Sequence, residues 1–201
     1  MNLSLVHGIA PSQQVPVVVQ QNGVNRLLLL RWGLIPYWAK DMSIGNKLIN
    51  ARAETLEEKP SFRKSLEQKR CLVLADGFYE WKNEGRVKRP YRFTLQDGGT
   101  FAFAGLWDSW LSSTGQKLDS FTIITTTPNK LVEPIHNRMP VILPQDMESV
   151  WLDQSVAWSC DVHSRLAPFP EEQIVAYEVS QTVNSSLNDG PECVVPVTRL
   201  F

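Results

Sequence analysis

The stretch Cys71-Leu-Val-Leu-Ala-Asp-Gly-Phe-Tyr-Glu-Trp-Lys82 is the part of the chain that best indicates its fold. The apolar run from Leu72 to Leu74 is typical of a buried strand. Asp76-Gly77 interrupts that run, and a bulge or tight turn at this point changes the direction of the residues that follow. The stretch therefore predicts a strand, a sharp turn and a second strand.

Glu80 is the residue of this stretch with the greatest chemical interest. Strand alternation places it on one face with Phe78, and places its neighbours Tyr79 and Trp81 on the other face. A carboxylate bracketed by aromatic rings loses part of its hydration, which raises its pKa and suits it to proton transfer near neutral pH. The alternative is a solvated glutamate at the end of a strand, and the local pattern leaves both open.

Size, composition and charge restrict the class of protein. A chain of 201 residues with 43% apolar residues is long enough for one soluble domain with an ordinary core, and we take residues 1–201 as a single domain. A formal net charge of −1 excludes a generally basic nucleic-acid binder but allows a local basic groove. Seven tryptophans indicate extensive packing or stacking.

The amino-terminal residues and the cysteines point to the cytoplasm. The chain does not open with the basic and apolar regions of a signal peptide, and the apolar run Leu27 to Leu30 is far too short to cross a bilayer. Cys71, Cys160 and Cys193 have no metal-ligand spacing and leave one thiol unpaired, so we expect reduced thiols. We expect a cytoplasmic monomer, associated with the nucleoid if bacterial, without a membrane partner.

Short apolar runs separated by turn residues predict many strands and few helices. Turn residues at 20–23 predict a hairpin near the beginning, and Pro60 opens a helix that ends near Gln68. The predicted strands lie within 15–19, 27–32, 48–54, 71–82, 91–95, 101–107, 121–126 and 175–179, and the predicted helices over 60–68 and 145–152. This order predicts an α+β fold, mostly antiparallel β-sheet closing toward a barrel, with a few short helices.

Two further segments carry candidate polar side chains. In a strand over 48–54, Asn50, Arg52 and Glu54 share one face, which is either a wet edge or the lining of a cleft. His136 and Arg138 lie in a loop that prolines make rigid. A lone loop histidine is more often structural or merely exposed, and nothing in the spacing shows that His136 and Glu80 meet.

Cationic and aromatic side chains suggest a nucleic-acid ligand. Arg52 and Arg138 could hold phosphates, and Trp38 and Trp81 could stack on bases, as in proteins that bind single strands without reading their sequence. Core packing is the alternative for every tryptophan. The chain contains no P-loop, dinucleotide fingerprint or zinc motif, so we expect neither a metal nor a cofactor.

Taken together, these segments resemble the SRAP family of abasic-site processing proteins, over nearly the whole chain. The matching segments are Ile9-Ala10-Pro11, Trp32-Gly33-Leu34-Ile35-Pro36, Ile49-Asn50-Ala51-Arg52-Ala53-Glu54-Thr55, Lys59-Pro60-Ser61-Phe62, Ala75-Asp76-Gly77-Phe78-Tyr79-Glu80-Trp81-Lys82, Ile135-His136-Asn137-Arg138-Met139-Pro140, and Val179-Ser180 with Val183-Asn184. The resemblance implies a compact domain that binds single-stranded DNA and captures ring-opened abasic sugars. In the family, removal of the initiator methionine exposes a cysteine whose amine and thiol close a thiazolidine on the sugar aldehyde.

The resemblance also implies roles for individual residues. Asn50 is similar to the asparagine that orients the cysteine and contacts the adduct, Glu80 to the acidic residue of self-processing and proton transfer, and His136 to the histidine that helps open the sugar ring. The implied DNA-binding residues are Arg52 and Arg138 on phosphates, Trp38 and Trp81 around the lesion, and Pro11 and Thr125 on the DNA-facing wall.

The amino terminus departs from the family pattern. The family opens Met-Cys-Gly-Arg, whereas this chain opens Met1-Asn2-Leu3-Ser4. Three explanations stay open: a start upstream of Met1, a shortened chain, or a family member that keeps the groove without the nucleophile. We expect the chain that begins at Met1 to form no stable thiazolidine, because that ring needs an amine and a thiol on one residue.

Three functional hypotheses follow from the sequence. The first is an abasic-site processing protein on single-stranded DNA, with covalent capture in a form that carries the amino-terminal cysteine. The second is a non-catalytic single-strand binding protein, whose salt-sensitive binding ignores the lesion. The third is an autopeptidase-like hydrolase with Glu80 as the base.

Overall fold

The computed structural model describes residues 8–156 and 160–197, so Met1-Asn2-Leu3-Ser4 lies outside the described residues. The strands of the described part are β1 (Gln14–Gln21), β2 (Val24–Trp32), β3 (Asn50–Arg52), β4 (Arg70–Ala75), β5 (Phe78–Glu84), β6 (Val87–Leu95), β7 (Phe101–Leu111), β8 (Lys117–Thr126), β9 (Met139–Pro140), β10 (Ile142–Leu143) and β11 (Ile174–Glu178). The α-helices are α1 (Pro60–Gln68), α2 (Gln145–Leu152) and α3 (Cys160–Ser164), and the 3-10 turns are η1 (Met42–Lys47), η2 (Ala53–Thr55), η3 (Glu171–Gln173), η4 (Gln181–Asn184) and η5 (Pro191–Cys193).

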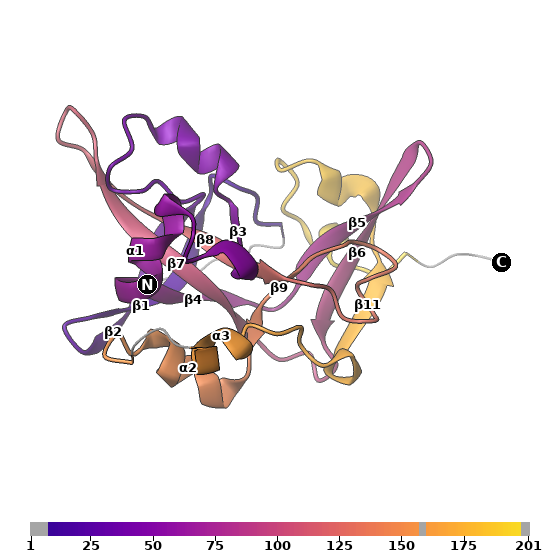
Figure 1. The fold of residues 1–201 in the computed structure, drawn as a ribbon. Coiled ribbons are helices and arrows are strands. Elements are labelled where there is room, and N and C mark those ends of the chain that lie inside the picture. The colour runs from indigo at the N-terminus through magenta and orange to yellow at the C-terminus, as the bar shows by residue number, and fades with distance from the viewer. Residues whose placement is uncertain (1–7, 157–159, 198–201) are drawn as a thin grey trace.

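The larger sheet closes into a barrel. Its strands follow the order β7-β4-β1-β2-β8, and β8 pairs with β7 to complete the ring. β3 and β9 add to β8, and β10 adds to β7. Every pairing is antiparallel except those of β2 and β3 with β8. The predicted mostly antiparallel sheet that closes toward a barrel is therefore confirmed (Figure 1).

The predicted hairpin near the beginning of the chain is formed by β1 and β2. The two strands pair along their whole length, from Gln14 with Arg31 to Gln21 with Val24. Asn22 and Gly23 make the turn with φ values of 54° and 74°, the left-handed backbone that two-residue hairpin turns require. Asparagine and glycine adopt this conformation at the lowest cost, which explains why the hairpin was predictable.

Asp76-Gly77 carries the chain from the barrel into a second sheet. β4 ends in the barrel at Ala75, and β5 begins the three-stranded antiparallel sheet β11-β6-β5 at Phe78. A side chain at Gly77 would place its Cβ 2.8 Å from the carbonyl oxygen of Phe93, so only glycine fits the close approach of the two segments. The predicted turn thus divides the molecule into two sheets, which lie side by side in Figure 1.

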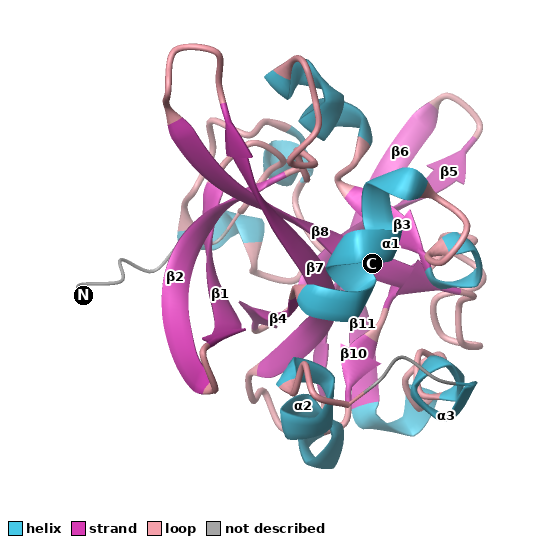
Figure 2. Cartoon of the chain, turned by 60° about the vertical axis from the view of Figure 1, so that its left-hand side comes forward, coloured by secondary structure: helices cyan, strands magenta, loops and turns pink. Residues whose placement is uncertain are grey.

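Two helices cover the outer face of the barrel. α1 and α2 pack against β4 and β7, and Figure 2 shows α1 lying across the strands. Phe62 and Leu66 of α1 and Trp151 of α2 are buried in a cluster on this side, and a second cluster fills the barrel interior around Val17, Phe103 and Phe121. The helices predicted over 60–68 and 145–152 are both confirmed.

The strand predicted over 48–54 is shorter in the structure. β3 covers only Asn50–Arg52, and Ala53–Thr55 turns as a 3-10 helix. The predicted alternation still holds, because Ala51 and Ala53 are buried while Asn50, Arg52 and Glu54 are exposed. Every helix in the described part of the chain is too short or too polar to span a lipid bilayer.

Candidate functional site

A cavity of about 430 Å³ opens between the barrel and the second sheet. Its floor is the apolar barrel interior, including Phe103, Phe121 and Ile123. One wall is the stretch from Ala75 to Trp81, and another is the segment from Val183 to Ser186. The sequence stretch that transfers the chain between the sheets therefore also lines the cavity, so fold and site depend on the same residues.

Glu80 lines this cavity and contacts His136, which lies outside the lining. Oε2 of Glu80 lies 3.3 Å from Nδ1 of His136. The side chain of Glu80 is 19% exposed and that of His136 is 41% exposed. Burial raises the pKa of Glu80 to about 7, and the charge of His136 acts in the opposite direction. A carboxyl group in this state can take up and release a proton near neutral pH.

Asn50 lies at the rim of the same cavity with its side chain exposed. Its amide makes no hydrogen bond to any other residue within 8–156 and 160–197, so its donors and acceptor are available to a ligand. Backbone pairing of β3 with β8 places Asn50 opposite Ile123 and Arg52 opposite Thr125. Thr125 is buried and lines the cavity.

Pro11 lines the cavity, and its loop is hydrogen-bonded to a neighbouring arginine. Ser12, which has a φ of 77°, donates its backbone N–H to the carbonyl of Trp32 at 2.9 Å. The guanidinium of Arg31 donates to the Ser12 hydroxyl at 2.9 Å and to the Gly33 carbonyl at 3.3 Å. Arg31 thereby joins the loop that contains Pro11 to the loop that contains Gly33.

His136 is braced by the backbone of Arg138. Its Nδ1 lies 3.0 Å from the carbonyl oxygen of Arg138 and 3.3 Å from the backbone nitrogen of the same residue. The Arg138 guanidinium donates to both carboxylate oxygens of Glu54, at 2.7 and 2.9 Å, and to the carbonyl of Thr125 at 2.6 Å. The loop before β9 is therefore held to η2 and β8 by a side chain that the sequence analysis assigned to a phosphate.

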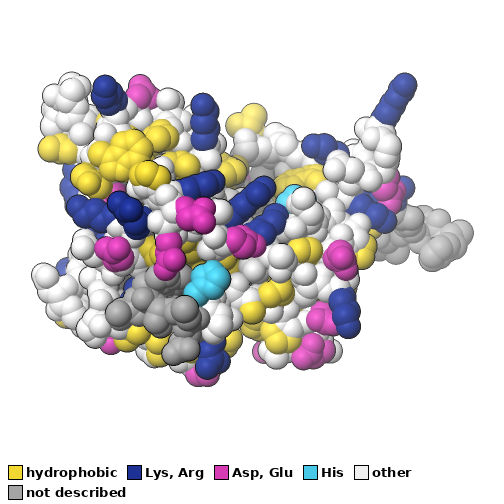
Figure 3. All heavy atoms as spheres, in the orientation of Figure 1, with side chains coloured by type: hydrophobic (Ala, Val, Ile, Leu, Met, Phe, Trp, Pro, Cys, Tyr) yellow, Lys and Arg dark blue, Asp and Glu magenta, His cyan; other side chains and the backbone are white. Residues whose placement is uncertain are grey.

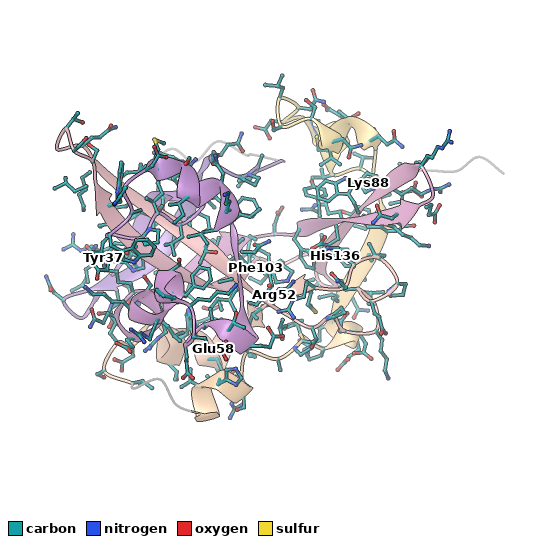
Figure 4. The ribbon with its side chains drawn as sticks, turned by 45° about the horizontal axis from the view of Figure 1, so that its top comes forward. Tyr37, Arg52, Glu58, Lys88, Phe103 and His136 are labelled. Carbon is teal, nitrogen blue, oxygen red and sulfur yellow. The ribbon has the colours of Figure 1, made fainter. Side chains whose placement is uncertain are left out.

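Arg52 is exposed on β3, beside the cavity. Figure 3 shows lysine and arginine side chains across the middle of the molecular face, with aspartate and glutamate side chains among them. Figure 4 shows Arg52 and His136 in the region between the barrel and the second sheet.

The two tryptophans of the predicted site are separated. Trp81 lines the cavity, and its Nε1 donates to Oδ1 of Asn184 at 2.7 Å, which joins β5 to η4. Trp38 is 46% exposed and lines a different hollow of about 870 Å³ together with Tyr37 and residues of α1. Figure 4 shows Tyr37 at the other end of the barrel from His136. Trp38 therefore does not contact the cavity that holds Glu80.

Arg92 and Asn184 also line the cavity, although the sequence analysis gave neither a role. Arg92 is 8% exposed; its Nη2 lies 3.0 Å from Asp76 Oδ2, and its Nη1 donates to the hydroxyl of Tyr177 at 2.9 Å. Burial raises the pKa of the adjacent Tyr79 hydroxyl to about 12, so this phenol stays protonated. The sequence around Arg92 does not indicate that its side chain is buried beside a cavity. That placement depends on the pairing of β6 with β5 and β11.

Comparison with known proteins identifies the family. The family described as SOS response associated peptidase (SRAP) matches residues 2–186. The chain belongs to the SRAP family. Among SRAP relatives, the abasic site processing protein YoqW of Bacillus subtilis is 49% identical over 189 residues, which cover 94% of this chain and 84% of YoqW. The abasic site processing protein HMCES of Gallus gallus is 33% identical over 220 residues, covering 93% of this chain and 65% of HMCES.

A solved structure supports the same fold for this SRAP chain. The crystal structure of a protein from Bacteroides thetaiotaomicron matches with a TM-score of 0.85 at 36% sequence identity, covering 93% of this chain and 82% of that one. Both the family resemblance and the fold expected from the sequence are therefore confirmed.

Proposed function

We propose that this SRAP protein processes abasic sites and binds the ring-opened sugar of single-stranded DNA in the cavity between its two sheets. The observation that carries the proposal is a cavity lined by Asn50 and Glu80, in which Glu80 is also in contact with His136. An abasic nucleotide lacks a base, so its sugar can enter a narrow cavity that an intact nucleotide cannot. The names of relatives such as YoqW and HMCES, abasic site processing proteins, support an abasic site as the substrate.

The three polar side chains have complementary tasks in this proposal. Glu80, with a pKa of about 7, protonates the oxygen of the sugar as its ring opens, and His136 exchanges the proton with it. The free amide of Asn50 donates a hydrogen bond to the resulting aldehyde. The apolar floor around Phe103 and Phe121 excludes bulk water, which strengthens both interactions.

Covalent capture requires an amine and a thiol on the same residue. In a form that carries an amino-terminal cysteine (the cysteine form), the α-amine attacks the aldehyde carbon, a C–N bond forms and water leaves to give an imine. The thiol then adds to the imine carbon, and its proton passes to the nitrogen to complete the thiazolidine. The chain that begins at Met1 can form only the hydrolysable imine.

The hollow around Trp38 is proposed to hold the strand that flanks the lesion. Tyr37 and Trp38 are about half exposed there, and the α1 residues Arg63 and Lys64 lie beside them. Nζ of Lys64 is 4.1 Å from the centroid of the Tyr37 ring. Exposed rings beside cations are the chemistry that binds unpaired bases and phosphates.

Three single-stranded oligonucleotides of one sequence test the proposal: one intact, one with an abasic site, and one whose abasic aldehyde has been reduced to the alcohol. The cysteine form should give a heat-stable shifted band on a denaturing gel with the abasic strand alone. The chain that begins at Met1 should bind the abasic strand more tightly than the intact strand and give no such band. A cysteine form that gives no heat-stable band, or equal binding of the intact and abasic strands, contradicts the proposal.

A second candidate function is peptide-bond hydrolysis. It is favoured by the family description as a peptidase and by a carboxyl group whose pKa of about 7 suits a general base, Glu80. A proteomic cleavage assay with the wild-type chain and Glu80→Gln tests it. Peptides released by the wild type and absent with the variant support hydrolysis, and identical peptide sets exclude it.

A further inference from the structure

Glu54 makes the most complete side-chain ion pair near the cavity. Its two carboxylate oxygens accept hydrogen bonds from both terminal nitrogens of Arg138, at 2.7 and 2.9 Å. The Arg138 side chain is 18% exposed, so the pair is shielded from water on one side. The hydrogen bonds from Arg138 hold the pKa of the Glu54 carboxyl below its ordinary value, so Glu54 is ionised at neutral pH.

Arg138 is fixed on a second side as well. Its Nη2 donates to the carbonyl of Thr125 on β8 at 2.6 Å. Its Nε is buried and has no hydrogen-bond partner among the described residues. The guanidinium is thus committed to Glu54 and Thr125, and a phosphate that reached Arg138 would compete with the Glu54 carboxylate for the same nitrogens.

The backbone of Arg138 holds the imidazole that faces Glu80. Nδ1 of His136 lies 3.0 Å from the Arg138 carbonyl oxygen, and the same atom lies 3.3 Å from Glu80 Oε2. A shift of the Arg138 backbone therefore changes the distance between His136 and Glu80. An unbroken series of contacts runs from Glu54 through Arg138 and His136 to Glu80, which lines the cavity.

We propose that Glu54 is a positioning residue, which fixes the Arg138 backbone and thereby holds His136 in contact with Glu80. Glu54 does not line the cavity, so its effect on the site passes through Arg138. This proposal rests on the proposed function in one respect: the proposed function gives the Glu80–His136 pair its role in proton transfer. The geometry itself belongs to the protein without DNA and is tested without DNA.

The direction of change in the pKa of Glu80 separates this role from a simple charge effect. The charge of His136 lowers the pKa of Glu80, against the effect of burial. If Glu54→Gln releases His136, burial acts unopposed and the pKa of Glu80 rises. If Glu54 acts only as a distant negative charge, its removal makes ionisation of Glu80 easier and the pKa falls.

Other ionisable groups that line the cavity are either paired or neutral. Arg92 lies within 3.0 Å of Asp76, and Tyr79 stays protonated with a pKa of about 12. His136 is the charged group that acts on the Glu80 carboxyl from the loop before β9. A rise in the pKa of Glu80 in Glu54→Gln is therefore a report on His136.

The experiment follows the Glu80 carboxyl carbon by NMR across a pH titration of the wild type, Glu54→Gln and the matched control Glu57→Gln. Glu57 is exposed, lies three residues away and makes no ion pair within the described ranges. We expect the pKa of Glu80 to rise by about half a unit or more in Glu54→Gln, and to stay constant or fall slightly in Glu57→Gln. A constant or lower pKa in Glu54→Gln overturns the inference.

Two further measurements keep the result interpretable. Arg138→Lys retains the positive charge but cannot bind both oxygens of Glu54, so it should also raise the pKa of Glu80. This variant replaces Glu54→Gln if Glu54→Gln does not fold. The abasic-strand assay is run on Glu80→Gln in parallel. If Glu80→Gln loses lesion recognition but the pKa of Glu80 is unchanged in Glu54→Gln, only the inference about Glu54 is rejected. If Glu80→Gln keeps lesion recognition and the pKa rises in Glu54→Gln, only the proposed function is rejected.

Discussion

Nδ1 of His136 lies 3.3 Å from Oε2 of Glu80, although the two residues come from different parts of the fold. β5 brings Glu80 from the second sheet, and the loop before β9 brings His136 from the end of the barrel. Burial and the imidazole charge act on the Glu80 carboxyl in opposite directions, and its pKa of about 7 results from the balance. Burial therefore brings the Glu80 carboxyl close to neutral pH in its titration, and the contact with His136 limits how far its pKa rises.

The stability of the protein should depend on pH through Glu80. The pKa of Glu80 is about 7 in the folded protein, whereas a solvated glutamate, as in the unfolded chain, has a pKa of 4.5. Its favourable contribution is complete below about pH 4.5, and it is lost as the pH rises to about 7, because the unfolded chain releases the proton first. We expect the free energy of unfolding of the wild type to fall by roughly 3 kcal/mol relative to Glu80→Gln over this interval.

Urea unfolding of both chains at several pH values from 4 to 8 measures this difference. Glu84→Gln is a suitable control, because Glu84 is exposed and its ion pairs with Lys82 and Arg89 lie at the far end of β5. Parallel curves for the wild type and Glu80→Gln would show that Glu80 titrates in the folded protein as it does in the unfolded chain.

The sequence predicted the local elements well and the site only in part. Asn22-Gly23 indicates a strand end because few residues adopt its left-handed backbone, and Asp76-Gly77 because only glycine fits the close approach to Phe93. The meeting of Glu80 with His136 depends on packing between distant segments, which no local pattern encodes. The same limit explains why the strand predicted over 48–54 is too long. Alternation alone predicts that the strand continues past Arg52, whereas the chain turns there and Glu54 pairs with the distant Arg138.

Asn50→Ala should weaken lesion recognition without weakening the fold. The Asn50 side chain is exposed and forms no hydrogen bond with the described parts of the protein, so we expect the free energy of unfolding to change by less than about 0.5 kcal/mol. Loss of one hydrogen bond to the sugar aldehyde corresponds to about 1 kcal/mol, or roughly fivefold in the preference for the abasic strand. Competition binding between abasic and intact strands measures this preference, with Asn83→Ala at the exposed end of β5 as the control. An unchanged preference would remove Asn50 from the site.

Replacement of Arg63 and Lys64 by alanine should reduce the salt dependence of DNA binding. Both cations lie beside Trp38, outside the cavity. Each phosphate contact that is lost lowers the slope of the logarithm of affinity against the logarithm of salt by about 0.7 for a single strand. We expect weaker binding of intact and abasic strands alike, with the ratio between them unchanged.

Lys88→Ala provides the control for that measurement. Lys88 is exposed near the start of β6, and Figure 4 shows it far from Tyr37. Its replacement removes one positive charge without touching the hollow, so the slope should stay within error of the wild type. An equal loss of slope in Lys88→Ala and in the double variant would indicate general electrostatic attraction in place of a binding surface.

Arg70→Met should destabilise the whole protein, because Arg70 serves as a common cap for two helices. The side chain is 1% exposed, and its guanidinium donates to the carbonyls of Leu66 at the end of α1 and Trp151 in α2, at 3.0 and 2.7 Å. The carbonyls at helix ends have no partner within the helix, and each one left buried without a donor costs about 1–3 kcal/mol. We expect Arg70→Met to lower the free energy of unfolding by at least about 3 kcal/mol in urea titrations, whereas Arg63→Met on the exposed face of α1 changes it by less than about 0.5 kcal/mol. Equal stability of the two variants would mean that water replaces the guanidinium at both helix ends.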